Sequence, residues 1–245
     1  MGWLIKKAIA TKLANLAATG EVSHSCYDAL IFGKVKQMMG GKLRSMVTAS
    51  APLSAEVLDF LRIAFCCDLR EGYGMTETCG ASCATYTADP TSGHVGGPLA
   101  QVKLRLRDIP EMNYLHTNDP PKGEVCFWGP SNMIGYFKNP EKTAESKSKD
   151  GWIFSGDVGR LNKDMSLSIV DRAKNIFKLS QGEYIAPEKL ENIFVQSSYV
   201  QQCFVYGDSL RDYTIAFFCL DDAAFKWGKA KGLSKEQMCS SKEFR

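Results

Sequence analysis

Residues 44–77 read RSMVTASAPLSAEVLDFLRIAFCCDLREGYGMTE, and this stretch decides the fold. Its apolar residues predict a strand at 44–48, a helix at 54–65 and a second strand at 67–70. Ser54 is the predicted N-cap of the helix. A strand, a helix and a strand in this order form the unit of a parallel sheet, and ligands bind beyond the carboxyl ends of such strands. The loops that follow the two strands are therefore predicted to border a ligand site.

The chain before this unit is predicted to be helical. Residues 3–18 predict an amphipathic helix, which we expect to pack on the domain rather than on a membrane. Its lysines, Lys6, Lys7 and Lys12, are predicted to lie away from the apolar face. Residues 27–39 predict a second helix, which ends at a pair of glycines.

The chain after this unit changes character near Pro98. Strands separated by Gly, Pro, Asn and Asp turns are expected first, and helix returns after Lys174. The predicted elements are strands at 102–107, 123–128 and 167–171, a helix at 187–195, and strands at 200–206 and 214–220. We therefore predict an α/β chain with an α/β part, a mostly β part and the start of a small α+β domain.

The composition excludes several classes of protein. The 245 residues include 30 basic and 27 acidic ones, a net charge of +3, which is too balanced for a nucleic-acid-binding surface. The nine cysteines form no CxxC pair, so we expect reduced thiols inside the cell rather than a zinc site. The N-terminus does not have the pattern of a signal peptide, and no apolar stretch is long enough to span a bilayer. Nucleic acid is therefore not an expected partner of this chain.

Residues with chemical uses gather in the loop YGMTE at 73–77. The ring of Tyr73 can stack on a purine, and Gly74 allows a ligand to approach the backbone closely. The hydroxyl group of Thr76 can bond a phosphate oxygen, and the carboxylate of Glu77 can hold Mg²⁺. Taken alone, the loop is equally consistent with a tight turn between two elements.

A second group of such residues lies farther along the chain. Asp157 follows the apolar sequence GWIF in the turn SGD, and a carboxylate there can accept hydrogen bonds from two neighbouring sugar hydroxyls. The alternative is an aspartate that only caps the turn. Arg172 and Lys174 either belong to a site or form a solvated basic edge.

The order of the motifs resembles the adenylate-forming superfamily of acyl-CoA synthetases, luciferases and peptide-synthetase adenylation domains. The motifs are TASAPLS (48–54), EGYGMTE (71–77), GWIFSGD (151–157), DRAKNIFKLSQGEYIAPEKLE (171–191) and VYGDS (205–209). Three further segments look most like eukaryotic long-chain fatty-acid–CoA ligases: GGPL (96–99), RDIPEMNY (107–114) and FKLSQGEYIAPEKLENIF (177–194).

The resemblance implies a reaction in two steps. ATP and a fatty acid give acyl-AMP and pyrophosphate with the help of Mg²⁺, and the CoA thiol then displaces AMP. The mixed anhydride supplies a good leaving group, and a hinged small domain rotates between the two steps. The implied parts are the C-terminal part of a large AMP-binding domain (1–98), a β-barrel-like subdomain (99–170), and a hinge with an incomplete small α+β domain (171–245).

The resemblance also implies roles for single residues. Tyr73 matches the residue that stacks on adenine, Thr76 the one that bonds the α-phosphate, and Glu77 the Mg²⁺ ligand. Asp157 matches the aspartate that binds ribose, with Arg172 as its partner. The other matched positions are the adenine-loop residues Ser50, Ala51 and Pro52, the nucleotide-loop glycine Gly74, the hinge residue Lys174, the CoA-side residues Gly182 and Glu183, and Lys178, a lysine used in the second conformation.

Some features depart from the family pattern. Ala49 stands where relatives often have glycine, and Ser155 replaces a more usual threonine. No Ser/Thr/Gly-rich phosphate loop ending in Pro-Lys-Gly is present, and we expect this loop before Met1. We expect the adenylation lysine beyond Arg245, so the chain should be truncated at both ends and should not make acyl-CoA alone.

Two alternatives remain open from the sequence. The acid can be aromatic or short rather than a long-chain fatty acid. The chain can also be a ligase-derived protein that binds nucleotide or a partner without catalysis. The parent protein is expected in the cytoplasm or on the cytosolic face of the endoplasmic reticulum, mitochondrion or peroxisome, where it can be associated with the membrane.

Overall fold

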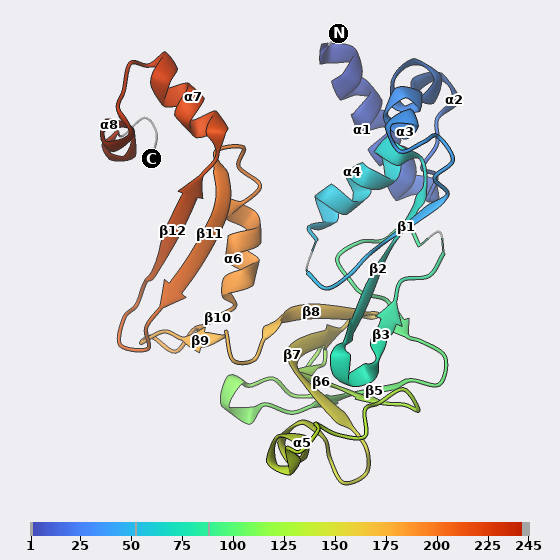
Figure 1. Cartoon of the computed structure of the whole chain (residues 1–245), viewed down its shortest axis with the longest axis vertical. Coiled ribbons are helices and arrows are strands. Elements are labelled where there is room, and N and C mark those ends of the chain that lie inside the picture. The colour runs from blue at the N-terminus through green and yellow to red at the C-terminus, as the bar shows by residue number, and fades with distance from the viewer. Residues whose placement is uncertain (1, 52, 88, 242–245) are drawn as a thin grey trace. The chain divides into compact units, whose positions relative to one another are not determined.

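The computed structural model describes residues 2–51, 53–87 and 89–241. The chain folds into two compact units, Met1–Ile169 and Val170–Arg245, which we describe one at a time (Figure 1). Within the described residues, no helix is both long enough and apolar enough to cross a membrane.

Helices form one end of the first unit. They are α1 (Gly2–Thr19), α2 (Ser25–Tyr27), the π-helical turn η1 (Asp28–Phe32), α3 (Gly33–Met38) and α4 (Ala55–Phe65). The side chains of Ala8, Phe32 and Ala64 pack together and join α1, η1 and α4. The hydroxyl group of Ser54 accepts a hydrogen bond from the amide of Val57 at 3.4 Å. The predicted helix and its N-cap are therefore confirmed.

Lys12 contradicts the predicted polar face of α1. Its side chain is completely buried, whereas the two lysines nearer the N-terminus are exposed. The ammonium group forms an ion pair with Asp28 and lies 4.4 Å from the centre of the Phe32 ring. The helical period places Lys12 on the same side as Ala8 and Leu16. Its alkyl chain therefore fills the core, and Asp28 supplies the opposite charge.

The predicted strand–helix–strand unit is confirmed. The two strands are parallel, and α4 connects them. In order across the sheet, the strands are β1 (Ser45–Thr48), β2 (Asp68–Met75), β3 (Gly80–Ala84) and β4 (Gly97–Pro98). Figure 1 shows β2 as a long strand, and residues 72–75, which we expected in a loop, pair with β3. The strand ends at Met75, and the 3₁₀ turn η2 (Thr76–Thr78) follows it.

The mostly β part is an open antiparallel sheet. Its strands, in order, are β5 (Lys103–Arg107), β6 (Lys122–Trp128), β7 (Ile153–Leu161) and β8 (Leu167–Arg172). The short helix α5 (Pro140–Ser146) lies between β6 and β7, and the turn η3 (Pro110–Met112) follows β5. Among the described residues no ladder joins β5 to β8. The expected barrel-like subdomain is therefore an open sheet here, because a barrel closes only when its edge strands pair.

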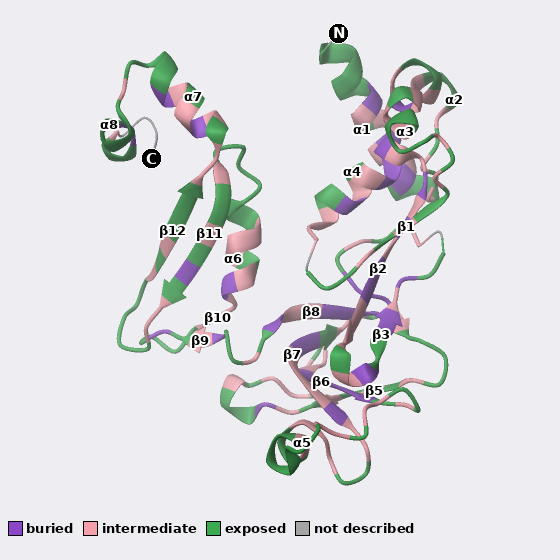
Figure 2. Cartoon of the chain, viewed as in Figure 1, coloured by how far each residue is buried: buried purple, intermediate pink, exposed green. Residues whose placement is uncertain are grey.

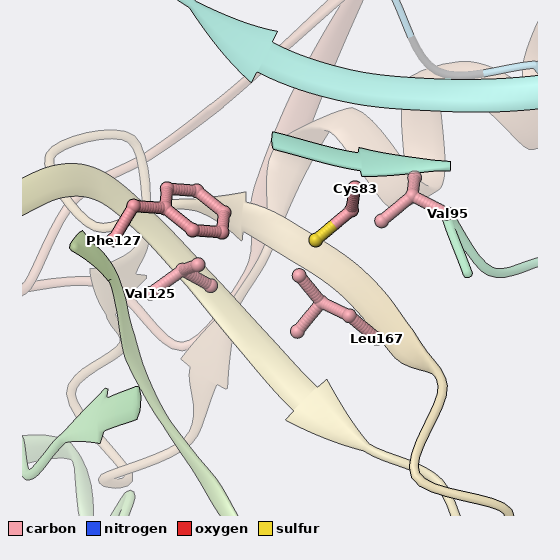
Figure 3. Packing of buried hydrophobic residues seen from close by; sticks show 5 residues of the cluster. All are labelled: Cys83, Val95, Val125, Phe127 and Leu167. Carbon is pink, nitrogen blue, oxygen red and sulfur yellow. The ribbon is translucent and has the colours of Figure 1, made fainter. Parts of the chain in front are cut away.

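One apolar core lies between the two sheets. Cys83 of β3 and Val95 pack against Val125 and Phe127 of β6 and Leu167 of β8. Figure 3 shows the Cys83 sulfur directed toward this group, and Figure 2 shows buried residues along β6 to β8. Each buried large apolar side chain contributes roughly 1.5–3 kcal/mol relative to an exposed one. This core holds β2 and β3 against the second sheet.

The second unit is a small α+β unit. Its elements are β9 (Phe177–Lys178), β10 (Tyr184–Ile185), α6 (Pro187–Phe194), β11 (Val200–Gly207), β12 (Thr214–Leu220), α7 (Asp222–Ala230) and α8 (Lys235–Ser240). The helix and strands predicted between 187 and 220 are confirmed. Pro187 occupies the first turn of α6, where a missing N–H is tolerated. The ring of Phe194 meets that of Phe218 edge to face at 5.2 Å, which packs α6 on the β11–β12 hairpin.

An acidic side chain is buried beside the parallel strands. Glu71 of β2 is 8% exposed. Burial raises the pKa of its carboxyl group from 4.5 to about 7, and the positive charge of Arg62 only partly opposes the rise. Arg62 is itself held by carbonyl oxygens of Leu69 and Thr91, both at 3.1 Å. Stability should therefore depend on pH near neutrality.

The buried ion pair gives the first prediction. Lys12→Ala should lower the free energy of unfolding by about 3 kcal/mol, because it leaves Asp28 without its cation and opens a cavity in the core. Lys6→Ala on the same helix should change it by less than about 0.5 kcal/mol. Urea denaturation of the three proteins measures both effects. Equal, small losses would contradict a structural role for Lys12.

Glu71 gives a prediction about pH. The folded state holds the Glu71 proton more tightly than the unfolded state, so the free energy of unfolding falls as pH rises from about 4.5 to 7. Glu71→Gln should remove this loss and stabilise the protein at pH 8 by about 2 kcal/mol, after allowance for solvent screening. At pH 4 the variant and the unmodified protein should be equal. The exposed substitution Glu145→Gln is the control, and a pH-independent difference for Glu71→Gln would refute the explanation.

Candidate functional site

Tyr73 and Asp157 are in contact, although 84 residues separate them in sequence. The Tyr73 hydroxyl donates a hydrogen bond to Oδ2 of Asp157 at 2.5 Å. Burial and the charge of Asp157 raise the pKa of Tyr73 well above its usual range, so its hydroxyl remains a donor at neutral pH. The ring of Tyr73 lies 5.8 Å from that of Phe127, centre to centre. Two residues predicted to bind one nucleoside thus lie together.

A β-bulge positions Tyr73. On β2, Tyr73 pairs with Cys83 but Gly74 pairs with Ala81, so Ser82 of β3 is the extra residue. A Cβ atom at Gly74 would lie 1.9 Å from a backbone oxygen of β3, so only glycine fits there. The hydroxyl of Ser82 is buried, and among the described residues it is the one buried side-chain oxygen or nitrogen without a hydrogen-bond partner.

A second bulge positions the aspartate. Residues 155–157 of β7 lie opposite the single residue Val125 of β6. Gly156 adopts a φ of +74°, which favours glycine, and its amide donates to the Glu124 carboxylate at 3.0 Å. Glu124 also forms an ion pair with Arg107. The turn is therefore anchored to the neighbouring strand, and the aspartate leaves the regular pleat.

Turn η2 presents Thr76 and Glu77. Thr76 is exposed and Glu77 is half-buried. The Thr78 hydroxyl accepts a hydrogen bond from the amide of Met75 at 3.3 Å, which holds the turn. The carboxylate of Glu77 accepts a hydrogen bond from the Tyr136 hydroxyl, and this contact raises the pKa of Tyr136.

The oxygens of this turn suit a magnesium ion that binds together with a nucleotide. Mg²⁺ is usually held by one or two carboxylates and by substrate phosphates. Throughout the described part of the chain, no group of three or more His, Cys, Asp or Glu side chains could hold a metal by itself. The carboxylate of Glu77 thus fits Mg²⁺ only as one ligand among several.

The predicted adenine loop follows β1. Ser50 has a φ of +73°, and both Ser50 and Ala51 are exposed. Pro52 lies outside the described residues. A Cβ atom built on Gly72 would lie 3.9 Å from that of Ala49, so this loop runs beside β2 one residue before Tyr73.

The remaining predicted residues lie in the second unit. Asp171 was not predicted as a site residue, and its buried carboxylate accepts hydrogen bonds from the amides of Arg172 and Glu188 at 2.6 and 3.1 Å. Arg172 and Lys174 are exposed. Asp171 therefore fixes the backbone from which the predicted ribose partner and hinge residue project.

The predicted CoA-side residues lie on a turn between β9 and β10. Gly182 has a φ of +95°, and its amide donates to the carbonyl oxygen of Leu179 at 2.8 Å. Lys178 and Glu183 are exposed, and the Lys178 ammonium lies 5.2 Å from the centre of the Tyr184 ring. The glycine therefore closes a tight turn at the surface of this unit.

Sequence reasoning missed the residues that hold the site in place. Tyr136 and Glu124 both contact predicted site segments, but each acts on a residue far from it in sequence. Tyr136 stands in a stretch without a clear period, and Glu124 sits in a predicted strand. Only the three-dimensional contacts between distant segments reveal either role.

Comparison with known proteins agrees with the motifs. Residues 8–137 match the family described as AMP-binding enzyme. Long-chain-fatty-acid–CoA ligase 1 of Homo sapiens is 45% identical over 99% of this chain and 35% of its own length. The peroxisomal long chain acyl-CoA synthetase 7 of Arabidopsis thaliana is 44% identical over 92% of this chain and 33% of its own. The chain thus spans about a third of the length of these two relatives.

Two solved structures share the fold. The A domain of carboxylic acid reductase from Segniliparus rugosus, in complex with AMP and a carboxylic acid, is 29% identical. It covers 94% of this chain and 38% of its own, with a TM-score of 0.68. O-succinylbenzoate CoA synthetase from Bacillus subtilis, with ATP and magnesium, covers 83% and 44% with a TM-score of 0.64 at 20% identity. The chain therefore belongs to the AMP-binding enzyme family, in which it is similar over nearly its whole length to long-chain fatty-acid–CoA ligases.

Proposed function

We propose that this chain binds the adenosine part of ATP and AMP through Tyr73 and Asp157. We further propose that it serves the ATP-dependent joining of a long-chain fatty acid to CoA. The observation that carries the first proposal is the contact between these two side chains, which come from different sheets. The second rests on the similarity to long-chain ligases.

The proposed nucleotide geometry follows from the chemistry of the side chains. Asp157 accepts hydrogen bonds from the ribose hydroxyls, and the phenol of Tyr73 fixes the orientation of the carboxylate before ribose arrives. The ring of Tyr73 and the loop at 49–51 border the adenine. Thr76 donates to the α-phosphate, and Glu77 binds Mg²⁺. When bound, Mg²⁺ neutralises charge on the phosphates during attack by the fatty carboxylate.

The second unit is proposed to serve the CoA step. Arg172 acts as the partner of Asp157 at the ribose, and Lys174 is the hinge about which this unit rotates. Gly182 and Glu183 form the turn that faces the CoA channel, and Lys178 acts in the same conformation. The exposed positions of Lys174, Lys178 and Glu183 support roles that require contact with a mobile ligand or domain.

The proposed domain organisation has three parts. Residues 1–98 form part of the large AMP-binding domain, 99–170 its mostly β subdomain, and 171–245 the hinge and part of the small domain. We propose an intracellular location, which agrees with the odd number of cysteines, nine, and with the peroxisomal location named for one relative.

A second candidate is a protein that binds nucleotide without catalysis. It is kept open because no Ser/Thr/Gly-rich loop ending in Pro-Lys-Gly occurs in these 245 residues, where the Pro-Lys-Gly at 121–123 leads directly into strand β6. Pyrophosphate release with ATP, Mg²⁺ and palmitate separates the two: the second candidate predicts nucleotide binding without turnover even when such a loop and an adenylation lysine are supplied.

The nucleotide site is tested through Asp157. Asp157→Ala should weaken the binding of AMP to this chain at least about tenfold, because a hydrogen bond to a charged group contributes roughly 1.5–3 kcal/mol. Isothermal titration calorimetry measures the dissociation constant, and thermal melting checks the fold. Asp212→Ala removes an exposed carboxylate in the second unit and should leave AMP binding unchanged. Equal affinity in all three proteins would remove Asp157 from the site.

The acid is tested in a protein that joins this chain to a phosphate loop and an adenylation lysine. Among carboxylic acids, palmitate should give a higher kcat/KM than acetate or a cinnamate, because each methylene buried in an apolar tunnel contributes about 0.8 kcal/mol. Acyl-CoA formation is measured for each acid. A preference for acetate or cinnamate would reject the long-chain assignment and leave the family assignment intact.

A further inference from the structure

The loop after β6 is docked on Glu77 by two separate contacts. The amide of Met133 donates a hydrogen bond to the carbonyl oxygen of Glu77 at 2.8 Å. Three residues later, the hydroxyl of Tyr136 donates to Oε1 of the same residue. One loop therefore holds both the backbone and the side chain of Glu77. Tyr136 is 59 residues away from Glu77 in sequence.

The loop that carries Tyr136 is itself fixed at several points. The side-chain amide of Asn132 donates to the carbonyl oxygens of Phe127 and Gly151 at 3.0 and 3.2 Å, which ties the loop to β6 and to the turn that precedes β7. The ammonium group of Lys147 donates to the carbonyl oxygen of Met133 at 2.7 Å. The position of the loop is thus set by bonds that do not involve Glu77.

The end of the loop is equally constrained. The amide of Tyr136 donates to the hydroxyl of Thr143 in α5 at 2.9 Å. A Cβ atom at Gly135 would lie 2.8 Å from the Thr143 side chain, so α5 and the loop approach each other closely beside Tyr136. The tyrosine therefore projects toward Glu77 from a fixed backbone, and ordering its side chain costs little further entropy.

We infer that Tyr136 is a positioning residue for Mg²⁺ binding by Glu77, an inference that rests on the proposed nucleotide site. The phenol engages Oε1, and a carboxylate has a second oxygen that a cation can share. A hydrogen bond of this kind holds a metal ligand in its binding orientation before the ion arrives. Partners that orient metal ligands in this way contribute about 10- to 100-fold to metal affinity.

The test is the Mg²⁺ dependence of nucleotide binding to this chain. A non-hydrolysable ATP analogue is titrated by calorimetry at a series of Mg²⁺ concentrations and in EDTA. Tyr136→Phe should raise the Mg²⁺ concentration at half-effect about tenfold, the lower end of that range because Tyr136 is partly exposed. Binding in EDTA should stay unchanged, since the phenol acts only through Glu77. Tyr86→Phe removes a hydroxyl from a 75% exposed tyrosine and should have no effect.

A double-mutant cycle separates positioning from a general loss of structure. Glu77→Gln should abolish most of the Mg²⁺ dependence, and Tyr136→Phe should then add no further change. Thermal melting checks that each variant folds. An unshifted Mg²⁺ midpoint in Tyr136→Phe, or an equal effect of this change with and without Glu77, would overturn the inference alone. Failure of the unmodified chain to bind the analogue at any Mg²⁺ concentration would overturn both the nucleotide site and this inference.

Discussion

The packing of the two sheets against each other is the constraint on which the site depends. Cys83, Val125, Phe127 and Leu167 are 0% exposed, and they lie where β3 meets β6 and β8 (Figure 3). Packed sheets are about 10 Å apart, a distance that a tyrosine side chain and an aspartate can bridge together. Tyr73 joins the edge of this core, and its hydroxyl reaches the carboxylate on β7. The apolar layer thus fixes the distance between the Tyr73 hydroxyl and the Asp157 carboxylate, which are 84 residues apart in sequence.

Two local irregularities in the packed sheets shape the candidate site. In a regular strand, successive side chains point to opposite faces of the sheet. A strand that directs its apolar side chains toward the other sheet would therefore direct its polar side chains away from it. The bulge at residues 155–157 breaks the alternation on β7, and the bulge opposite Tyr73 does so on β3. Gly74 and Gly156 make these shapes possible, one through close backbone approach and one through a positive φ. The sheets supply rigidity, and the bulges direct the side chains.

The sequence predicted the features that depend on nearby residues. The strand–helix–strand unit, the cap at Ser54 and the helix that begins at Pro187 follow from local periodicity and capping. The features that depend on distant residues were missed. Residues 72–75 form a strand because β3 pairs with them, and Lys12 is buried because Asp28, 16 residues away, supplies its counter-charge. The periodicity of the sequence describes only neighbouring residues, so it cannot predict pairing between distant segments.

The candidate site follows the same division. The motifs identified Tyr73, Glu77 and Asp157 as chemistry-bearing residues, since those residue types suit purine, cation and sugar. They gave no sign of the phenol of Tyr136, which reaches Glu77 from a loop without a regular pattern. The resemblance also implied a β-barrel-like subdomain where the described strands form an open sheet. The residue types thus predict which chemical groups are available. Contacts between distant segments decide how the side chains that carry these groups are oriented.

The charges in the site explain why a nucleotide and a cation should bind together. Asp157 and Glu77 are both carboxylates, and the proposed ligand carries several negative charges of its own. In the proposed binding mode, Asp157 would attract the ligand only through hydrogen bonds to neutral sugar hydroxyls, so it would not need to approach the phosphates. Glu77, beside them, would repel the ligand unless a divalent cation lay between the carboxylate and the phosphate oxygens.

A tyrosine that supplies a hydrogen bond without a charge can hold Glu77 in place and leave this requirement for a cation intact. A lysine in its position would neutralise the carboxylate and compete with the cation. In the proposed site, a neutral donor would therefore keep nucleotide binding coupled to Mg²⁺.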